Sequence, residues 1–251
     1  YSGLIKDETI KKEIFQQCIL LSRRVKEESE NISDIKNANT KEALAEMALG
    51  NSPKVIHLLD NKLAPYSGDD VILVNAYRMQ GETAQAKVVN QILLYNNVIN
   101  TLALLHNYLS LNMKEPVLFE KIYSQGIQII ESFELTDILT NDVFGIHSTA
   151  AQGYLIQQER QKAMDALDRY VNTICSIQFP LSFKANEYFN QVAKWFEDNN
   201  CIGTNVPVDE ITLKKTFICI VAENPAFTPL REDERYKLIV KILKEKLGET
   251  D

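Results

Sequence analysis

The sequence is poor in residues that break helices. Only nine glycines and seven prolines are spread over 251 residues, and no stretch alternates apolar and polar residues between turn pairs such as Asn-Gly. Hydrophobic residues make up 45% of the chain and charged residues 24%, which is ordinary for a globular protein. The sequence therefore predicts an all-α fold without a β-sheet, as one elongated domain or two that merge.

The cysteines lack the spacing of a metal site or a disulfide framework. No two of them form a Cys-x-x-Cys pair, and they stand far apart in the chain: Cys18, Cys175, Cys201 and Cys219. Zinc ligands and disulfide-rich folds both favour closely and regularly spaced cysteines. We expect reduced thiols in a cytoplasmic protein, with no metal and no cofactor.

Export and membrane signals are also missing. No apolar run approaches the length of about 20 residues that spans a bilayer, and the start of the chain lacks a basic segment followed by an apolar one. We expect a soluble cytoplasmic protein that does not contact a membrane. Because the chain begins at Tyr1 without a methionine, we also expect it to be part of a longer protein.

Charge of one sign is in excess. The formal net charge is −7 and the sequence pI is near 5.2. Affinity for nucleic acid rests mainly on clustered Lys and Arg side chains that neutralise phosphates. The chain should therefore not bind DNA by itself.

Apolar residues recur at helical spacing along most of the chain. From Glu8 to about Ser29 they fall three and four residues apart, on one helix face: Ile14, Cys18, Leu21 and Val25. A helical hairpin follows, with Ala43, Leu44, Met47 and Ala48 before the turn at residues 50–53 and Val55, Ile56, Leu58 and Leu59 after it. Ser52 can cap the second helix, with Pro53 at its first position.

Further helices follow in pairs. Asp69 or Asp70 can cap a helix over residues 71–80, Gly81 breaks the chain, and a long helix begins near Glu82. Glu115-Pro116 starts the next helix, whose apolar side contains Phe119, Ile122, Tyr123, Ile127 and Ile130. The remaining predicted helices cover residues 141–157, 162–177, 183–197, 211–223 and 233–247.

Two hairpins share a spacing that is typical of tetratricopeptide (TPR) repeats. Tyr77 precedes Ala86 by nine residues, and Tyr154 precedes Ala163 by nine, each with a turn between. The small residue lets two helices approach while the ring packs over it. We therefore expect an α-solenoid of TPR-like hairpins in a single domain over residues 1–251, with residues 1–31 as an N-terminal helix that packs on or links to the array. Coincidence in a generic helical array would predict nearly the same architecture.

No constellation predicts an enzyme. His57, His106 and His147 lie in no His-Glu-x-x-His motif and beside no evident nucleophile. Asp69-Asp70 lacks a second aspartate cluster, and Asp165 and Asp168 lie among basic residues on what we interpret as a solvated, charge-balanced helix face. The isolated glycines form no phosphate-binding loop. We predict no catalytic residue.

The inner surface of a solenoid is a common place for a ligand. Asn75 and Gln152 each stand two residues before the tyrosine of their hairpin. An amide side chain both donates and accepts hydrogen bonds, so a column of amides can hold an extended peptide. Arg78, His147 and Trp195 are weaker candidates for the same site, and exposed polar residues without a ligand are an alternative interpretation of the amides.

Several short stretches form an ordered set of markers along the chain: residues 22–29, 84–88, 150–154 and 166–171, then Tyr188-Phe189, Trp195-Phe196, Asn224-Pro225-Ala226-Phe227, Leu230 and Tyr236. In this order they resemble the C-terminal regulatory region of bacterial helix-turn-helix transcriptional regulators of the Cro-repressor-like (XRE) type. The chain departs from the pattern at Asn186-Glu187 and at Pro207-Val208. The resemblance implies a TPR-like array that senses a signal and mediates dimerisation, with a DNA-binding domain expected upstream of Tyr1. It transfers no ligand-binding residue.

Two classes of function follow from these observations. The first is the ligand-sensing and dimerising region of a helix-turn-helix transcriptional regulator, which binds a peptide or small-molecule effector and contacts DNA only through a domain outside this chain. The alternative is a stand-alone TPR-like adaptor for protein partners, and an all-helical enzyme comes third. A regulator of two-fold operators is expected to be a homodimer. The stripe Ile14, Cys18, Leu21 and Val25 is a candidate part of that interface, although packing on the first hairpin is an equal alternative.

Overall fold

The computed structural model describes residues 7–59, 69–138, 141–199, 204–206 and 208–248. Within these ranges some side chains are not described: those of Ser33, Ser52, Ile56, His57, Leu59, Asp69, Asp70, Ile72, Asp137 and Asn199. Cys201, Pro207, the turn before residue 69 and the predicted caps at Ser52, Asp69 and Asp70 therefore lie outside the description. The described part of the chain is helical and contains no strand, which confirms the all-α prediction. Ser182 and Asn205 make an isolated antiparallel bridge.

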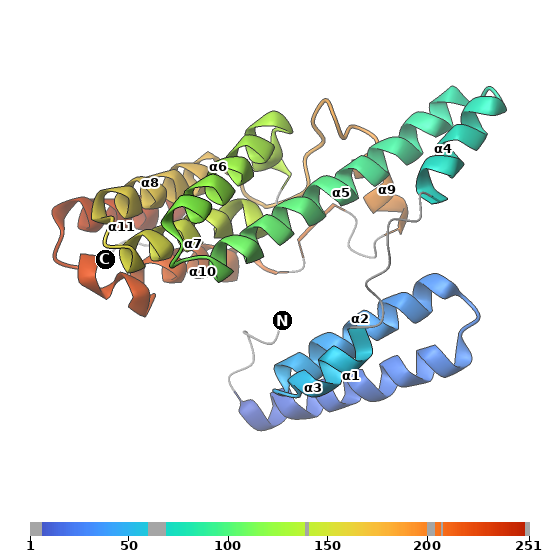
Figure 1. Cartoon of the computed structure of the whole chain (residues 1–251), viewed down its shortest axis with the longest axis horizontal. Helices are drawn as coiled ribbons and strands as arrows, with labels where there is room; N and C mark the ends of the chain where they lie inside the picture. Colours follow the sequence, from blue (N-terminus) through green and yellow to red (C-terminus); the bar gives the residue numbers. More distant parts are fainter. Residues whose placement is uncertain (1–6, 60–68, 139–140, 200–203, 207, 249–251) are drawn as a thin grey trace. The chain divides into compact units, whose positions relative to one another are not determined.

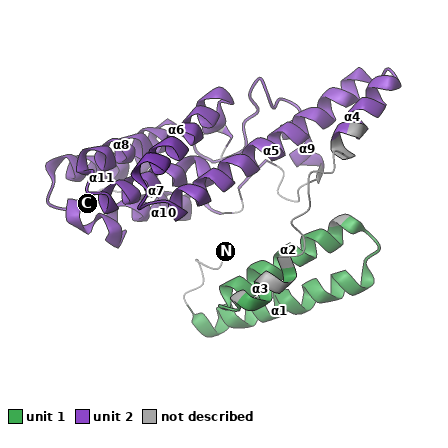
Figure 2. Cartoon of the chain, viewed as in Figure 1, with its two compact units in different colours: residues 1–68 green, residues 69–251 purple. Residues whose placement is uncertain are grey.

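The chain divides into two compact units, Tyr1–Gly68 and Asp69–Asp251 (Figure 2). Unit 1 consists of α1 (Glu8–Glu28), α2 (Ile32–Ala48) and α3 (Ser52–Leu59). Helix α1 begins where the Asp7 side chain accepts hydrogen bonds from the backbone N–H groups of Thr9 and Ile10, as an N-cap does. Helix α2 packs on both α1 and α3.

Unit 1 buries small and charged side chains more than large apolar ones. Its buried residues include Ala38, Ala43, Ala45 and Val55, with the carboxylates of Glu42 and Glu46. Leu44 and Met47, which we expected on the apolar side of the first hairpin, are exposed. The reason is that α1 covers the alanine and glutamate face of α2, which a hydrophobicity pattern does not identify.

Unit 2 contains the remaining helices, labelled in Figure 1. They are α4 (Asp69–Met79), α5 (Thr83–Leu111), α6 (Pro116–Ser132), the 3-10 helix η3 (Leu135–Asp137), α7 (Asn141–Ile156), α8 (Arg160–Ser176), α9 (Val192–Asn199), α10 (Glu210–Ala222), the 3-10 helix η4 (Pro225–Leu230) and α11 (Glu234–Leu247). Helix α5 contacts α4, α6, α7 and α9, while α8 contacts α7 and α11. The break at Gly81 and the long following helix are confirmed.

Helix α7 forms the centre of unit 2. Most of its side chains are buried, from Val143 to Tyr154. Its small residues admit close neighbours: a Cβ atom on Gly153 would overlap the fully buried ring of Phe119, and one on Gly145 would lie 2.6 Å from Cε1 of His106. A helix so crowded needs glycine at these contacts.

The segment before α9 differs from the prediction. We expected a helix over residues 183–197, but the helix begins at Val192. Upstream of it, Asn186 fixes an irregular backbone, because its Nδ2 donates to Phe133 O (2.7 Å) and its Oδ1 accepts from Phe189 N (3.0 Å). Phe183 and Phe189 then pack edge-on against Tyr95 of α5, with ring centroids 5.7 and 5.6 Å away. These aromatic contacts, together with the Asn186 hydrogen bonds, anchor the non-helical segment to α5 and α6.

Helix α5 is unusually long and apolar. Among the described residues it is the one helix that is long and apolar enough, by length and composition, to cross a bilayer. This differs from the expectation that no segment reaches that length. Of its most apolar 18-residue window, 17% is buried in the structure, and α5 contacts α4, α6, α7 and α9 of unit 2.

Candidate functional site

Three helix pairs end their first helix in the same way. In each, a residue with positive φ and the residue after it donate their N–H groups back to carbonyls of the last helical turn, which is the Schellman motif. The residues with positive φ are Gly50 (77°), Gly81 (78°) and Gln158 (63°). The carbonyls that accept from the following residue belong to Glu46, Tyr77 and Tyr154, at 2.9, 2.9 and 2.8 Å. The pairs α2/α3, α4/α5 and α7/α8 therefore share one turn geometry.

The shared turn geometry shows that the nine-residue Tyr/Ala spacing has an equivalent in a third hairpin. Nine residues after each of these carbonyls lies a buried small or β-branched residue: Val55, Ala86 and Ala163. The Tyr/Ala spacing found in the sequence thus marks equivalent positions of two hairpins, and the third pair carries Glu46 and Val55 there. The sequence predicted this hairpin but not its equivalence to the other two, because Glu46 and Val55 do not match the Tyr/Ala pattern.

The predicted ligand residues fall into separate places. Asn75 and Arg78 lie on α4, both exposed, and Arg78 Nη1 donates to Asn75 Oδ1 (3.4 Å). Gln152 lies half-buried on α7, at a distance along unit 2 from α4 (Figure 1). Trp195 lies half-buried on α9, with its ring 5.2 Å from that of Phe196. The structure brings Asn75 together with Arg78, whereas Gln152 belongs to another helix, α7.

A hollow of about 430 Å³ lies between α4 and α5. It is lined by Val74, Arg78, Thr83, Ala86, Lys87, Asn90 and Gln91. Arg78 and Lys87 are exposed and, among the described residues, neither makes an ion pair. The Gln91 side chain, one turn after Lys87 on α5, is held in place by two hydrogen bonds. Its Oε1 accepts from the backbone N–H of Gln191 (2.9 Å), and its Nε2 donates to Asn190 (3.2 Å). Two cations beside amide groups suit an anionic group such as a carboxylate.

His147 is part of the core of unit 2. It is 5% exposed, and its Nδ1 lies 2.9 Å from the hydroxyl of Tyr123. Burial lowers the pKa of His147 to about 4, with a smaller contribution from the positive charge of Arg169. The imidazole is therefore neutral near pH 7, and its Nδ1 makes one hydrogen bond with the Tyr123 hydroxyl. It packs the interior and presents no surface to a ligand.

Tyr154 is also held in place by its neighbours. Its hydroxyl donates to Glu120 Oε2 (3.0 Å), and Lys162 Nζ binds the same oxygen at 2.8 Å. The hydrogen bond from Lys162 is the main reason why the pKa of Glu120 is lowered. Burial and the bond to Glu120 raise the pKa of the Tyr154 hydroxyl. These groups join α6, α7 and α8 as a structural cluster.

One arrangement has the connectivity of a catalytic relay. His106 Nδ1 lies 2.8 Å from Asp142 Oδ1, and His106 Nε2 lies 2.9 Å from Thr149 Oγ1. A hydroxyl, an imidazole and a carboxylate in this order occur in nucleophilic enzymes. Here, however, Thr149 is 9% exposed and lies in the contact between α5 and α7, where Gly145 also touches the imidazole. We interpret the arrangement as a polar link between two helices.

Sequence analysis could not find this link. Asp142 and Thr149 stand two helical turns apart on α7, but His106 comes from another helix 36 residues before Asp142. Only the packing of α5 on α7 brings the three together.

Metal-binding chemistry has no support in the described ranges. No three His, Cys, Asp or Glu side chains come close enough together there to hold an ion. None of Cys18, Cys175 and Cys219 is in a disulfide with another described cysteine.

The comparisons with known proteins found no relative. No protein-family model matches the chain, and no curated protein or solved structure matches it.

Proposed function

We propose that this chain is the ligand-sensing and dimerising region of a bacterial helix-turn-helix transcriptional regulator of the XRE type, built as an α-solenoid of TPR-like hairpins. In this proposal the protein is cytoplasmic, has no catalytic activity, and contacts DNA through a domain upstream of Tyr1. The alternative is an adaptor that binds a protein partner with the same hairpins. The resemblance of residues 22–29, 84–88, 150–154 and 166–171 to such regulators favours the first.

The observation that carries the proposal is the repeated hairpin. The pairs α2/α3, α4/α5 and α7/α8 have the same Schellman turn, with a buried Val or Ala nine residues after the bonded carbonyl. Repeated hairpins of this kind form extended surfaces that bind peptides or small molecules. The geometry supports binding as the function, since the described polar clusters at His147, Glu120 and His106 are engaged in helix packing.

We assign the effector to the hollow between α4 and α5. Arg78 and Lys87 flank it, and Asn75 orients Arg78. An extended peptide with an acidic side chain or a free C-terminal carboxylate would pair with the two cations, while Asn90 would bond its backbone. A small carboxylate metabolite shares the same chemistry.

The test is a thermal-shift screen of peptides and carboxylate metabolites, followed by calorimetry. Arg78→Ala and Lys87→Ala should each weaken binding of a ligand found in this way by about tenfold, because each removes a charge-assisted hydrogen bond. Arg24→Ala, which removes an exposed cation from unit 1, is the matched control and should bind as the wild type does.

The amide prediction is tested with the same ligand. If its affinity is unchanged in the Asn75→Ala, Gln152→Ala double variant, those amides are not part of the site. If it is also unchanged in the Arg78→Ala, Lys87→Ala double variant, the hollow between α4 and α5 is not the effector site.

A further inference from the structure

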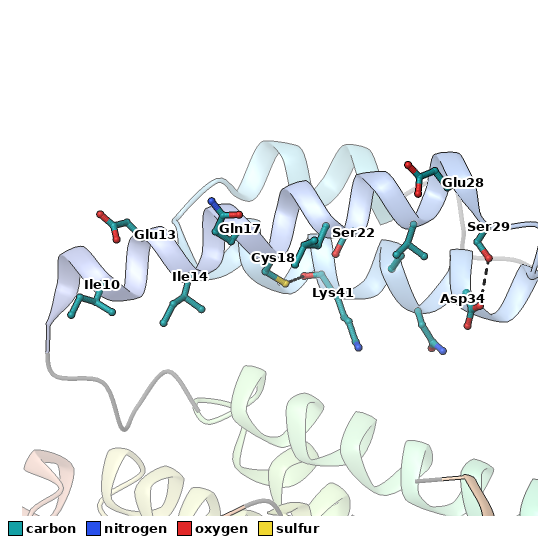
Figure 3. A pocket seen from close by; sticks show the side chains of 14 residues that line it. Ile10, Glu13, Ile14, Gln17, Cys18, Ser22, Glu28, Ser29, Asp34 and Lys41 are labelled. Carbon is teal, nitrogen blue, oxygen red and sulfur yellow. Dashed lines mark hydrogen bonds between the residues drawn. The ribbon is translucent and has the colours of Figure 1, made fainter. Parts of the chain in front are cut away.

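An apolar groove of about 1020 Å³ runs along α1 and α2 in unit 1 (Figure 3). Its apolar wall consists of Ile10 and the α1 stripe, which is Ile14, Cys18, Leu21 and Val25. Ile14 and Ile10 point to the same side of the helix in Figure 3. Exposure of these side chains is high, at 46% for Ile14, 60% for Leu21 and 39% for Val25.

The α1 stripe stays exposed within unit 1 because α1 uses another face to bind α2. That face contributes Ile19 and Ser22, both buried, together with Arg23 and Lys26. Arg23 Nε binds Glu42 Oε1 at 2.7 Å, and Lys26 binds the other oxygen of Glu42. Within the α1 stripe, Cys18 also contacts α2, with its Sγ 3.9 Å from Lys41 O, whereas Ile14, Leu21 and Val25 stay exposed. A contiguous exposed apolar patch of this kind marks an interaction surface.

The intervals between residues of the α1 stripe are symmetric about the middle of the stripe. Ile14, Cys18, Leu21 and Val25 are separated by four, three and four residues, which is the spacing of core positions in a coiled coil. A two-fold axis between Cys18 and Leu21 places Ile14 opposite the partner's Val25 and Cys18 opposite the partner's Leu21 when the helices are antiparallel. A surface that matches itself under a two-fold rotation fits a symmetric dimer.

Charge at the ends of the groove selects the antiparallel direction. Glu28, at the end of α1, and Asp34, near the start of α2, both line this end of the groove. A parallel arrangement would place each beside its own copy, which is repulsive. In the antiparallel arrangement Glu28 lies opposite the partner's Lys11, near the positive end of the partner's α1 dipole.

We propose that a second copy of this chain fills the groove, with α1 packed antiparallel on the partner's α1 about an axis between Cys18 and Leu21. The proposal specifies the dimerising part of the proposed function and rests on it only in that respect. It requires neither an effector nor a DNA-binding domain.

Sedimentation of the full chain tests the interface. The wild type should be a dimer at micromolar concentration, and Leu21→Glu should be a monomer because it places two carboxylates in the apolar contact. Leu20→Glu is the matched control: Leu20 is 57% exposed on the same helix but does not line the groove, so this variant should remain a dimer. Far-UV circular dichroism of each variant should show unchanged helicity.

Disulfide trapping tests the direction and the register. In a chain whose native cysteines are replaced by serine, Ile14→Cys and Val25→Cys are made separately, mixed to exchange subunits and then oxidised. The mixture should give a covalent dimer that joins the two different variants, while Ile14→Cys alone should not cross-link.

Each result supports the proposal or overturns it. A wild-type monomer overturns it together with the dimerising part of the proposed function. A dimer that Leu21→Glu leaves intact, or a covalent dimer from Ile14→Cys alone, overturns the groove assignment and leaves dimerisation through another surface. Effector binding measured on the Leu21→Glu monomer then tests the sensing role independently.

Discussion

At the scale of single residues, burial of His147 makes stability depend on pH. The folded protein holds this imidazole neutral, with a pKa of about 4 against 6.5 for an ordinary histidine. Below pH 6.5 the unfolded chain binds a proton that the folded chain does not, so stability is lost as pH falls from 6.5 to 4. The expected contribution is up to about 3 kcal/mol.

Urea unfolding at several pH values measures this effect. His147→Gln should show a clearly smaller loss of stability between pH 7 and pH 4.5 than the wild type, because glutamine does not titrate. Equal pH dependence in wild type and His147→Gln would mean that His147 is accessible to protons in the folded protein.

The backbone conformation of Gln158 predicts a measurable change in stability on substitution. It has φ of 63° at a position where the equivalent hairpins have Gly50 and Gly81. A side chain costs about 1 kcal/mol in this conformation, so Gln158→Gly should stabilise unit 2 by about 0.5–1 kcal/mol in urea unfolding. Gln161→Gly, inside α8, should instead destabilise it by about 1 kcal/mol. A stability loss in Gln158→Gly would contradict the turn geometry.

At the scale of elements, Arg23 joins α1 to α2 through two buried carboxylates. Glu42 and Glu46 are 3% and 1% exposed, and Arg23 binds both. Burial by itself would raise the pKa of Glu42, but hydrogen bonds from Lys26 and Arg23 outweigh it and the pKa is lowered. The contact between the two helices therefore depends on the cations that keep Glu42 ionised.

Removing Arg23 should unfold unit 1 more easily. Arg23→Met should cost about 2 kcal/mol or more, because it leaves buried carboxylates short of a partner. Arg24→Met is the matched control: Arg24 is exposed and binds only the exposed Glu28 (2.9 Å), so the expected cost is below about 0.5 kcal/mol. Hydrogen exchange should be faster at the α1 and α2 amides of Arg23→Met than at those of Arg24→Met. Equal protection in the two variants would show that the cluster of Arg23, Glu42 and Glu46 does not stabilise unit 1.

Sequence patterns predicted helices where the information is local. The positions of α4, α5, α6, α8, α10 and α11 follow from apolar spacing and from breakers such as Gly81 and Pro116, and the Tyr/Ala spacing located two equivalent hairpins. The start of α9 was missed because Asn186 and the aromatic contacts of Tyr95 act across long separations. The cluster of Arg23, Glu42 and Glu46 was missed for the same reason, since polar residues in a buried face look like surface residues in the sequence.

Candidate site residues were harder to predict. Arg78 was named as a weak candidate and lines the hollow between α4 and α5, but Lys87, which flanks it, was not named. His147 was named and is in the core. A sequence does not reveal which side of a helix faces a hollow when two helices contribute to it, whereas the amphipathic pattern of α1 did identify the groove stripe.

At the scale of the whole molecule, net charge limits the partners. Acidic residues outnumber basic ones by 34 to 27, so the isolated chain should not bind duplex DNA at physiological salt. Fluorescence anisotropy with a labelled duplex of random sequence should show no saturable binding at micromolar protein. Tight binding that weakens steeply with added salt would overturn this prediction and require a basic surface that the sequence does not suggest.

The regulatory assignment depends on what precedes this chain. The most direct measurement is the sequence of the coding region upstream of Tyr1. The proposed function predicts an in-frame segment that encodes a helix-turn-helix domain. A start codon at or just before Tyr1 would contradict the regulator and leave the stand-alone adaptor as the better account.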